Sequence, residues 1–162
     1  MKFLKLGLAS LVASSVLFAG NYNVDASHSN VGFSVKHMMI TNVTGKFNDV
    51  SGNFEYDEKT NTLKALSGDI IVASINTADE KRDTHLKAEE LFDAAKFPKI
   101  NFNATKIQEN AVYGDLTIKG ITKNIKLELE NGGTVTDPWG KQRAGFELVG
   151  KINRKDFGKI GR

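Results

Sequence analysis

The stretch NVGFSVKH, residues 30–37, decides the fold of this 162-residue chain. In it Val31, Phe33 and Val35 alternate with polar or small residues, and a period of two places them on one face of a β-strand. Turn-forming residues separate several such stretches, so we predict a mainly β protein with an antiparallel sandwich or barrel. Glycines inside the strands favour the strong curvature of a barrel. The other alternating stretches are KINFNAT (99–105), VYGDLTIKG (112–120), NIKLELE (124–130) and RAGFELVGKIN (143–153).

One segment departs from this pattern and predicts helix. In KRDTHLKAEELFDAAKFPKINF, residues 81–102, charged residues and good helix formers replace the alternation until Pro98, which ends a helix. Thr77 and Glu80, three residues apart, are typical of a capping box at a helix start. We predict one or two short helices inserted between strands and lying across one opening or flank of the barrel.

The first twenty residues have the layout of a secretory signal peptide. Lys2 and Lys5 precede an apolar run, residues 6–18, and the small residues Ala19 and Gly20 follow it. The run is shorter than the about 20 apolar residues that a membrane-spanning helix needs. We therefore predict a signal peptide over residues 1–20, export of the chain and one β-barrel domain over residues 21–162. An uncleaved N-terminal anchor is the alternative.

The composition argues against several classes of protein. Without Lys2 and Lys5, 20 basic residues stand against 19 acidic residues. Lys and Glu alternate, as in KLELE, instead of forming the basic patch of a nucleic-acid binder. The chain has no Cys, which excludes disulfides and thiol catalysis. We expect no nucleic-acid partner and no transmembrane span in the mature chain.

Signatures of catalysis and metal binding are missing from the sequence. It contains no GxSxG, HExxH or GxxxxGK[ST] pattern. His28 and His37 are nine residues apart, which sends them to opposite faces of a regular strand and disfavours a zinc site with His85. Arg82 and Asp83 could join His85 in a catalytic cluster, but neighbours on a short helix more often form local ion pairs or cap backbone amides. We therefore predict no catalytic residue, no metal and no cofactor.

The apolar interior leaves two interpretations open. An eight-stranded barrel has just enough room for side chains or for one ligand. The phenylalanines at positions 33, 47, 54, 102 and 146 can therefore either fill the core or line a ligand slot.

A series of ordered motifs resembles the YceI-like, or polyisoprenoid-binding, proteins of bacteria. The resemblance covers nearly all of the chain after the predicted signal peptide. It implies a lipocalin-like antiparallel β-barrel of about eight strands, with an apolar channel for an isoprenoid or similar amphiphile, and a periplasmic location. The motifs are DASHSNVGFSVKHM (25–38), GKF (45–47), SINTADEKRDTHLKAEELFDAAKFPKINF (74–102), GDLTIKGITK (114–123), DPWG (137–140), RAGFE (143–147) and INRKDFG (152–158).

The sequence departs from the family pattern at its C-terminal end. Family members normally continue after RKDFG with a strand that closes the barrel, whereas this chain ends at KIGR, residues 159–162. We therefore expect a C-terminally truncated barrel with unpaired strand edges, which puts ligand binding in doubt.

The resemblance leads us to expect a carrier or store for an isoprenoid or quinone-like lipid, acting without catalysis and forming a homodimer. A small enzyme acting on a lipid and a packed structural or stress-response envelope protein are the alternatives. The residues expected to bind the polar head are His28, His37, Arg82 and His85. Leu86, Phe92 and Phe97 are expected to cover one opening of the channel as a plug or gate. By alternation, the ligand-lining residues are expected to be Val31, Phe33, Val35, Phe47, Phe54, Ile100, Phe102, Leu116, Ile118, Phe146 and Leu148.

Overall fold

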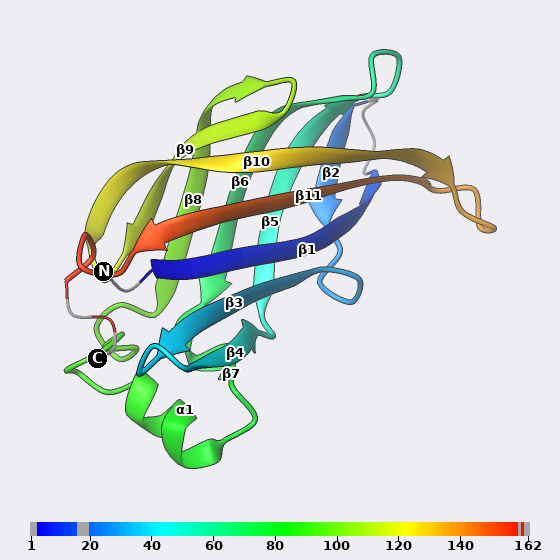
Figure 1. Ribbon diagram of the computed structural model, residues 1–162. Coiled ribbons are helices and arrows are strands. Elements are labelled where there is room, and N and C mark those ends of the chain that lie inside the picture. Colours follow the sequence, from blue (N-terminus) through cyan, green and yellow to red (C-terminus); the bar gives the residue numbers. More distant parts are fainter. Residues whose placement is uncertain (1–2, 16–19, 159, 161–162) are drawn as a thin grey trace.

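The computed structural model describes residues 3–15, 20–158 and 160, which form one curled antiparallel β-sheet (Figure 1). The sheet contains eleven strands, with one α-helix, α1 (Glu80–Leu86), and one 3-10 turn, η1 (Val72–Ser74), on the path between strands. The strands are β1 (Phe3–Ser15), β2 (Asn21–Val24), β3 (Asn30–His37), β4 (Thr41–Phe47), β5 (Val50–Asp57), β6 (Thr62–Ile71), β7 (Ile75–Asn76), β8 (Lys99–Gln108), β9 (Ala111–Ile118), β10 (Ile121–Thr136) and β11 (Gln142–Asn153). The prediction of a mainly β, lipocalin-like barrel fold with an inserted helix is confirmed.

The order of the strands closes the sheet on itself. Hydrogen-bonded neighbours follow the order β11-β10-β9-β8-β6-β5-β2-β1, and β1 also pairs with β11. Beyond β1 the strand order continues with β3, β4 and β7, which lie beside α1 (Figure 1). The strands from β8 to β11 form a meander. Each of them pairs with the next strand along the chain through a short turn.

The expected open seam is absent from the part of the chain that the structure describes. The backbone of β1 lies between β11 and β3 and is antiparallel to both, with Leu8 opposite Leu148 and Leu6 opposite Phe33. Two strand edges with unpaired N–H and C=O groups need a partner, and the apolar N-terminal run provides one in extended conformation. Among the described residues no strand follows β11, but the expected unpaired edge is wrong for this structure because β1 pairs there. The C-terminal truncation and the signal peptide stay predictions.

The buried side chains of the described residues form two packed clusters. In the first, the Phe47 ring contacts those of Phe33 and Phe92, with centroids 5.5 and 6.2 Å apart. In the second, Phe54 stacks on Tyr22 and meets Phe146 edge-on at 4.9 Å. Offset-stacked and edge-on pairs are the favoured arrangements of aromatic rings, so these contacts fix the packing as well as burying area.

The helix forms in the predicted segment but not with the predicted cap. The N-cap is Asp79, whose side chain accepts a hydrogen bond from the backbone N–H of Arg82 at 3.0 Å. Thr77 instead donates to Asp83 through its backbone N–H at 2.9 Å and its hydroxyl at 2.6 Å. The capping-box prediction is therefore wrong, because the carboxylate inside α1 reaches back to Thr77. Residues 87–97 form turns.

Removing residues 1–20 tests the role of β1 in closing the barrel. The chain 21–162 would leave the facing edges of β3 and β11 unpaired, so we expect their backbone amides to exchange with solvent at least about tenfold faster than in the chain 1–162. Hydrogen exchange followed by mass spectrometry measures this, and the β8–β9 amides, which keep both partners, are the internal control. Unchanged exchange in β3 and β11 would show that the seam does not depend on β1.

Candidate functional site

Two small apolar cavities lie in the interior of the barrel. The helix-end cavity, about 60 Å³, lies where α1 and the following turns meet the barrel and is lined by Phe33, Leu86, Phe92 and ten further residues. The mid-barrel cavity, about 70 Å³, is lined by residues that include Val31 and Phe102. Ile70 and Leu116 line both cavities, so the two cavities are neighbours separated by these side chains.

The alternation identified inward positions correctly. The residues expected to line the channel are either buried or partly buried and packed against the core. Phe54 and Phe146 belong to the second core cluster and line neither cavity. The others divide between the two cavities: Phe33, Val35, Phe47, Ile100 and Ile118 line the helix-end cavity, Val31, Phe102 and Leu148 the mid-barrel cavity, and Leu116 both. Their role in binding a ligand stays a prediction.

Sequence reasoning missed Ile70, Ile75 and Ile152 among the lining residues. Ile70 and Ile75 lie at the end of β6 and in β7, where Gly68 and Asp69 and the turn η1 interrupt the alternation. Ile152 continues the alternation of β11 from Leu148, so the same period could have identified it.

The glycine at position 45 allows the ring of Phe33 to enter the helix-end cavity. A Cβ at Gly45 would collide with the end of the Phe33 ring and would also meet the Thr77 side chain at 2.9 Å. Gly45 lies opposite Phe33 in the β3–β4 pairing. Glycine in a strand often marks such a close approach.

The segment predicted to cover the channel does reach the interior. Phe92 is buried, Leu86 is half-buried, and both line the helix-end cavity. Phe97 packs its ring on the backbone of the β9–β10 turn, where a Cβ at Gly120 would lie 2.9 Å from it. These apolar side chains therefore face the barrel end, as predicted, whereas a gating motion stays a prediction.

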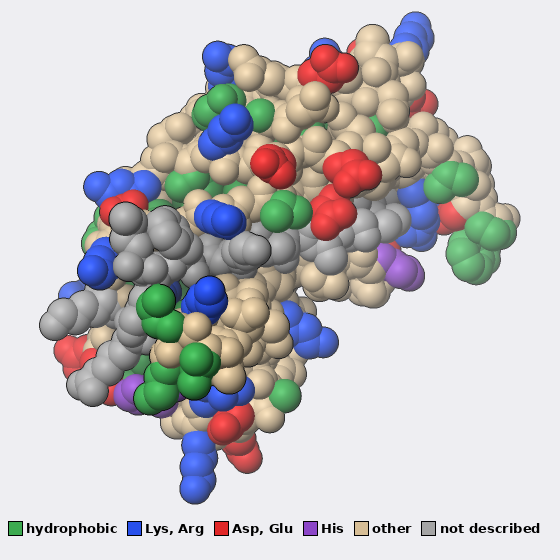
Figure 2. Space-filling view, in the orientation of Figure 1, with side chains coloured by type: hydrophobic (Ala, Val, Ile, Leu, Met, Phe, Trp, Pro, Cys, Tyr) green, Lys and Arg blue, Asp and Glu red, His purple; other side chains and the backbone are tan. Residues whose placement is uncertain are grey.

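The residues expected to bind a head group lie apart. His28 lies in the β2–β3 connection, and His37 is exposed at the β3–β4 turn, where Figure 2 shows hydrophobic side chains exposed around the turn. Arg82 donates to the hydroxyl and the carbonyl oxygen of Thr77, both at 2.8 Å. The His85 Nδ1 lies 3.2 Å from Glu90. None of the four lines either cavity, and their predicted role stays untested.

The polar residues of α1 hold the local structure together. Arg82 and Asp83 converge on Thr77, whose side chain is buried, and His85 points away to a solvent-exposed partner. The interpretation of this cluster as local ion pairs and backbone caps therefore fits the contacts. Among residues 3–15, 20–158 and 160, no group of three His, Cys, Asp or Glu could hold a metal ion.

A second polar network joins the β2–β3 connection to the β10–β11 hairpin. Asp25 accepts hydrogen bonds from the Ser27 hydroxyl at 2.6 Å and from Arg143 at 3.0 Å, and it lies 2.8 Å from His28 Nδ1. Arg143 also pairs with Asp137 at 2.8 Å. A catalytic triad needs the acid and the nucleophile on different nitrogens of the histidine. Here Ser27 and Asp25 both approach Nδ1, so this cluster lacks triad geometry.

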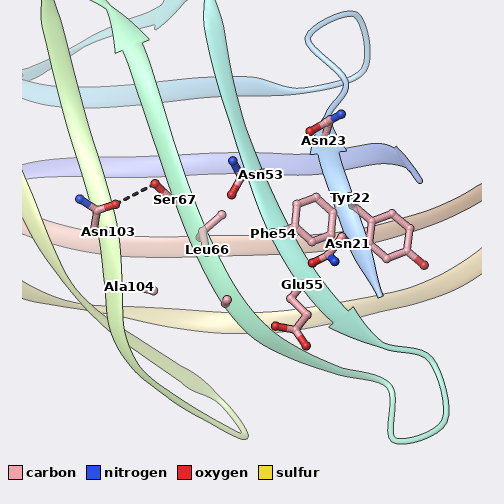
Figure 3. Close-up of a pocket in the computed structure, with 11 residues that line it drawn as sticks. Asn21, Tyr22, Asn23, Asn53, Phe54, Glu55, Leu66, Ser67, Asn103 and Ala104 are labelled. Carbon is pink, nitrogen blue, oxygen red and sulfur yellow. Dashed lines mark hydrogen bonds between the residues drawn. The ribbon is translucent and has the colours of Figure 1, made fainter. Parts of the chain in front are cut away.

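A larger hollow, about 380 Å³, lies on the strands β2, β5, β6 and β8 (Figure 3). Its exposed lining residues are polar apart from Ala65, and the buried Tyr22, Phe54 and Leu66 line it as well. The Ser67 hydroxyl donates to Asn103 at 2.7 Å. Asn23, Asn53, Ser67 and Asn103 are opposite one another in the strand registers, so they form a polar row across the four strands. Such a row offers amides and hydroxyls, which do not suit an apolar chain.

The hydrogen bonds to Asp25 predict how stability depends on pH. The Ser27 hydroxyl, followed by His28 and Arg143, holds the pKa of the Asp25 carboxyl well below its ordinary value. The stabilisation is therefore present above about pH 4 and is lost as the pH falls toward the folded-state pKa. We expect Asp25→Asn to lower the free energy of unfolding by about 1–3 kcal/mol at pH 7.

Chemical denaturation at several pH values, followed by circular dichroism, measures this effect. The difference between Asp25→Asn and the unmodified protein should shrink progressively from pH 4 to pH 2. Glu109→Gln, at an exposed position of the β8–β9 turn, is the matched control. An undiminished difference at pH 2 would contradict the assignment.

Comparison with known proteins places this geometry in a family. The model of the YceI-like domain matches residues 22–161. The UPF0312 protein plu2095 of Photorhabdus laumondii is 38% identical over 160 residues, which is 95% of this chain and 83% of the relative. The UPF0312 protein YE1254 of Yersinia enterocolitica is 37% identical over the same shares.

Solved structures share the architecture. The crystal structure of the Campylobacter jejuni YceI protein superposes with a TM-score of 0.68 at 40% identity, covering 83% of this chain and 81% of that one. Burkholderia cenocepacia BcnA, 19% identical, has the same fold with a TM-score of 0.61 over 78% of this chain and 98% of its own. From the extent of the domain match and the identity to these relatives, the chain belongs to the YceI-like domain family.

Proposed function

We propose that this protein binds an isoprenoid or another long-chain amphiphile inside its barrel and stores or carries it in the periplasm, without catalysis. The observation that carries the proposal is the pair of neighbouring apolar cavities, which share Ile70 and Leu116 among their described lining residues. An apolar chain is driven from water into such a space by about 0.8 kcal/mol for each buried CH₂ group. Membership of the YceI-like family supports the same proposal, because the motifs that resemble this family imply an isoprenoid or similar ligand.

Ligand entry requires side chains to move. Together the cavities hold far less than the about 300–1,000 Å³ of typical small-molecule sites. Ile70 and Leu116 are the side chains whose rotation would join them. Leu86 and Phe92 are the side chains whose displacement would open the helix end. In this proposal the helix segment gates the channel.

The small volume also favours one competing function. A barrel whose interior is filled by its own side chains would act as a structural envelope protein without a ligand. An enzyme acting on a lipid has less support, because the two polar clusters of the described residues serve local structure. No helix among the described residues is long and apolar enough to cross a membrane.

Binding of geranylgeraniol, followed by native mass spectrometry without detergent, tests the proposal. The protein should bind this isoprenoid alcohol, and Ile70→Phe should weaken binding at least about tenfold, since the larger ring blocks the passage between the cavities. Overpacking an interior costs about 1–3 kcal/mol, so the melting temperature of each variant is measured in parallel.

Val149→Phe is the matched control, because it adds a ring on the exposed face of β11 outside both cavities. It should bind within about twofold of the unmodified protein. No binding of either geranylgeraniol or geranylgeranyl phosphate would favour the packed structural barrel. Equal binding by both variants would place the ligand outside the two cavities.

A further inference from the structure

A charged side chain, that of Arg154, is buried beside the apolar helix-end cavity. Arg154 follows β11 directly, and only 7% of its surface is exposed. It lines the helix-end cavity, and the twelve other lining residues in the part of the chain that the structure describes are all apolar. Charges buried in proteins are normally paired, because their transfer from water is costly. The position of Arg154 therefore needs an explanation.

Two nitrogen atoms of the Arg154 guanidinium have no hydrogen-bond acceptor among the described residues. Its Nη1 donates to the carbonyl oxygen of Ile160 at 3.2 Å. Its Nε and Nη2 are buried and have no acceptor within the part of the chain that the structure describes. The ion pairs formed by those residues do not include Arg154.

Arg143 is paired with two carboxylates, whereas the described residues provide no carboxylate partner for Arg154. Hydrogen bonds from Arg143 to Asp137 and Asp25 raise the pKa of its guanidinium. Burial lowers the pKa of Arg154, and among the described residues no carboxylate forms an ion pair with it that would oppose this shift. An arginine stays protonated in either environment, so Arg154 keeps a positive charge beside the cavity that no carboxylate of the described residues balances.

The unused donors have the geometry of a fork. Nε and Nη2 point from one edge of the planar guanidinium, which matches two oxygens of a carboxylate or a phosphate. A hydroxyl or a single ketone oxygen would satisfy only one of these donors. An anion would also balance the charge, and the low dielectric of an apolar cavity strengthens such a pair.

We propose that Arg154 binds the anionic head group of the amphiphile, a group with two acceptor oxygens such as a phosphate ester or a carboxylate. The tail then runs past Ile70 and Leu116 toward the mid-barrel cavity. This inference rests on the proposed function and narrows it, because it prefers isoprenoid phosphates and fatty acids over neutral alcohols. The four residues that the sequence suggested for the head group are not required.

Selectivity between geranylgeranyl phosphate and geranylgeraniol tests this inference. The unmodified protein should bind the phosphate more tightly than the alcohol. Arg154→Met keeps an unbranched apolar side chain without the buried charge, a replacement that proteins often tolerate. It should weaken phosphate binding on the order of 30-fold and leave alcohol binding within about threefold. Arg154→Lys, which keeps the charge but loses the fork, should restore part of the preference.

Lys155→Met is the control for net charge, because this neighbouring lysine is exposed and lines neither cavity. It should keep the preference for the phosphate. Equal affinity for the two ligands, or a preference that survives Arg154→Met, would overturn the role of Arg154 while leaving the lipid-binding proposal intact. Failure of both ligands to bind would refute the lipid-binding proposal, and the role of Arg154 with it. A pure anchoring role for Arg154 would change the melting temperature without changing the selectivity.

Discussion

Closure of the antiparallel sheet is the constraint on which the rest of this structure depends. Each strand edge carries backbone N–H and C=O groups that need partners, and an interior sheltered from water exists only when all edges of the ring are paired. Here β1 completes the ring by pairing with β11 on one side and with β2 and β3 on the other. Any chain or segment that occupies this seam must therefore be extended and antiparallel to both neighbours.

The two ends of the barrel differ in whether carboxylates neutralise the charge of a buried or half-buried arginine. At the β10–β11 hairpin, Arg143 is held between Asp25 and Asp137. Near α1, Arg154 lies among apolar side chains with two donors left over among the described residues. The Thr77–Asp83 hydrogen bonds anchor α1 beside the same cavity, so that Leu86 and Phe92 cover the charged end. In our proposal the anionic head of a ligand pairs with Arg154 at this end, and its apolar tail contacts the apolar side chains of the barrel interior.

The alternation of apolar residues predicted the strands and the inward faces because each side chain on a strand points to the opposite side from its neighbour. The alternation predicted the inward orientation of Phe47 and Ile100 correctly, because both lie in regular strands. Local pairing rules worked less well: Thr77 and Glu80 have capping-box spacing, yet Asp79 caps the helix. Arg154 was missed although it continues the inward period of Leu148 and Ile152, because a charged residue that follows a strand is normally expected at the surface.

By itself, the sequence determined the fold class, the inward residues of the regular strands and the family resemblance, since all three depend on the local order of residue types. The tertiary structure alone decided which strand closes the ring, how the interior divides into two cavities and which polar groups lie beside them. These features depend on contacts between residues far apart in the chain, such as Leu86 with the barrel end and Asp25 with Arg143. Burial of a charge likewise depends on everything that surrounds it, and only the folded chain assembles those surroundings.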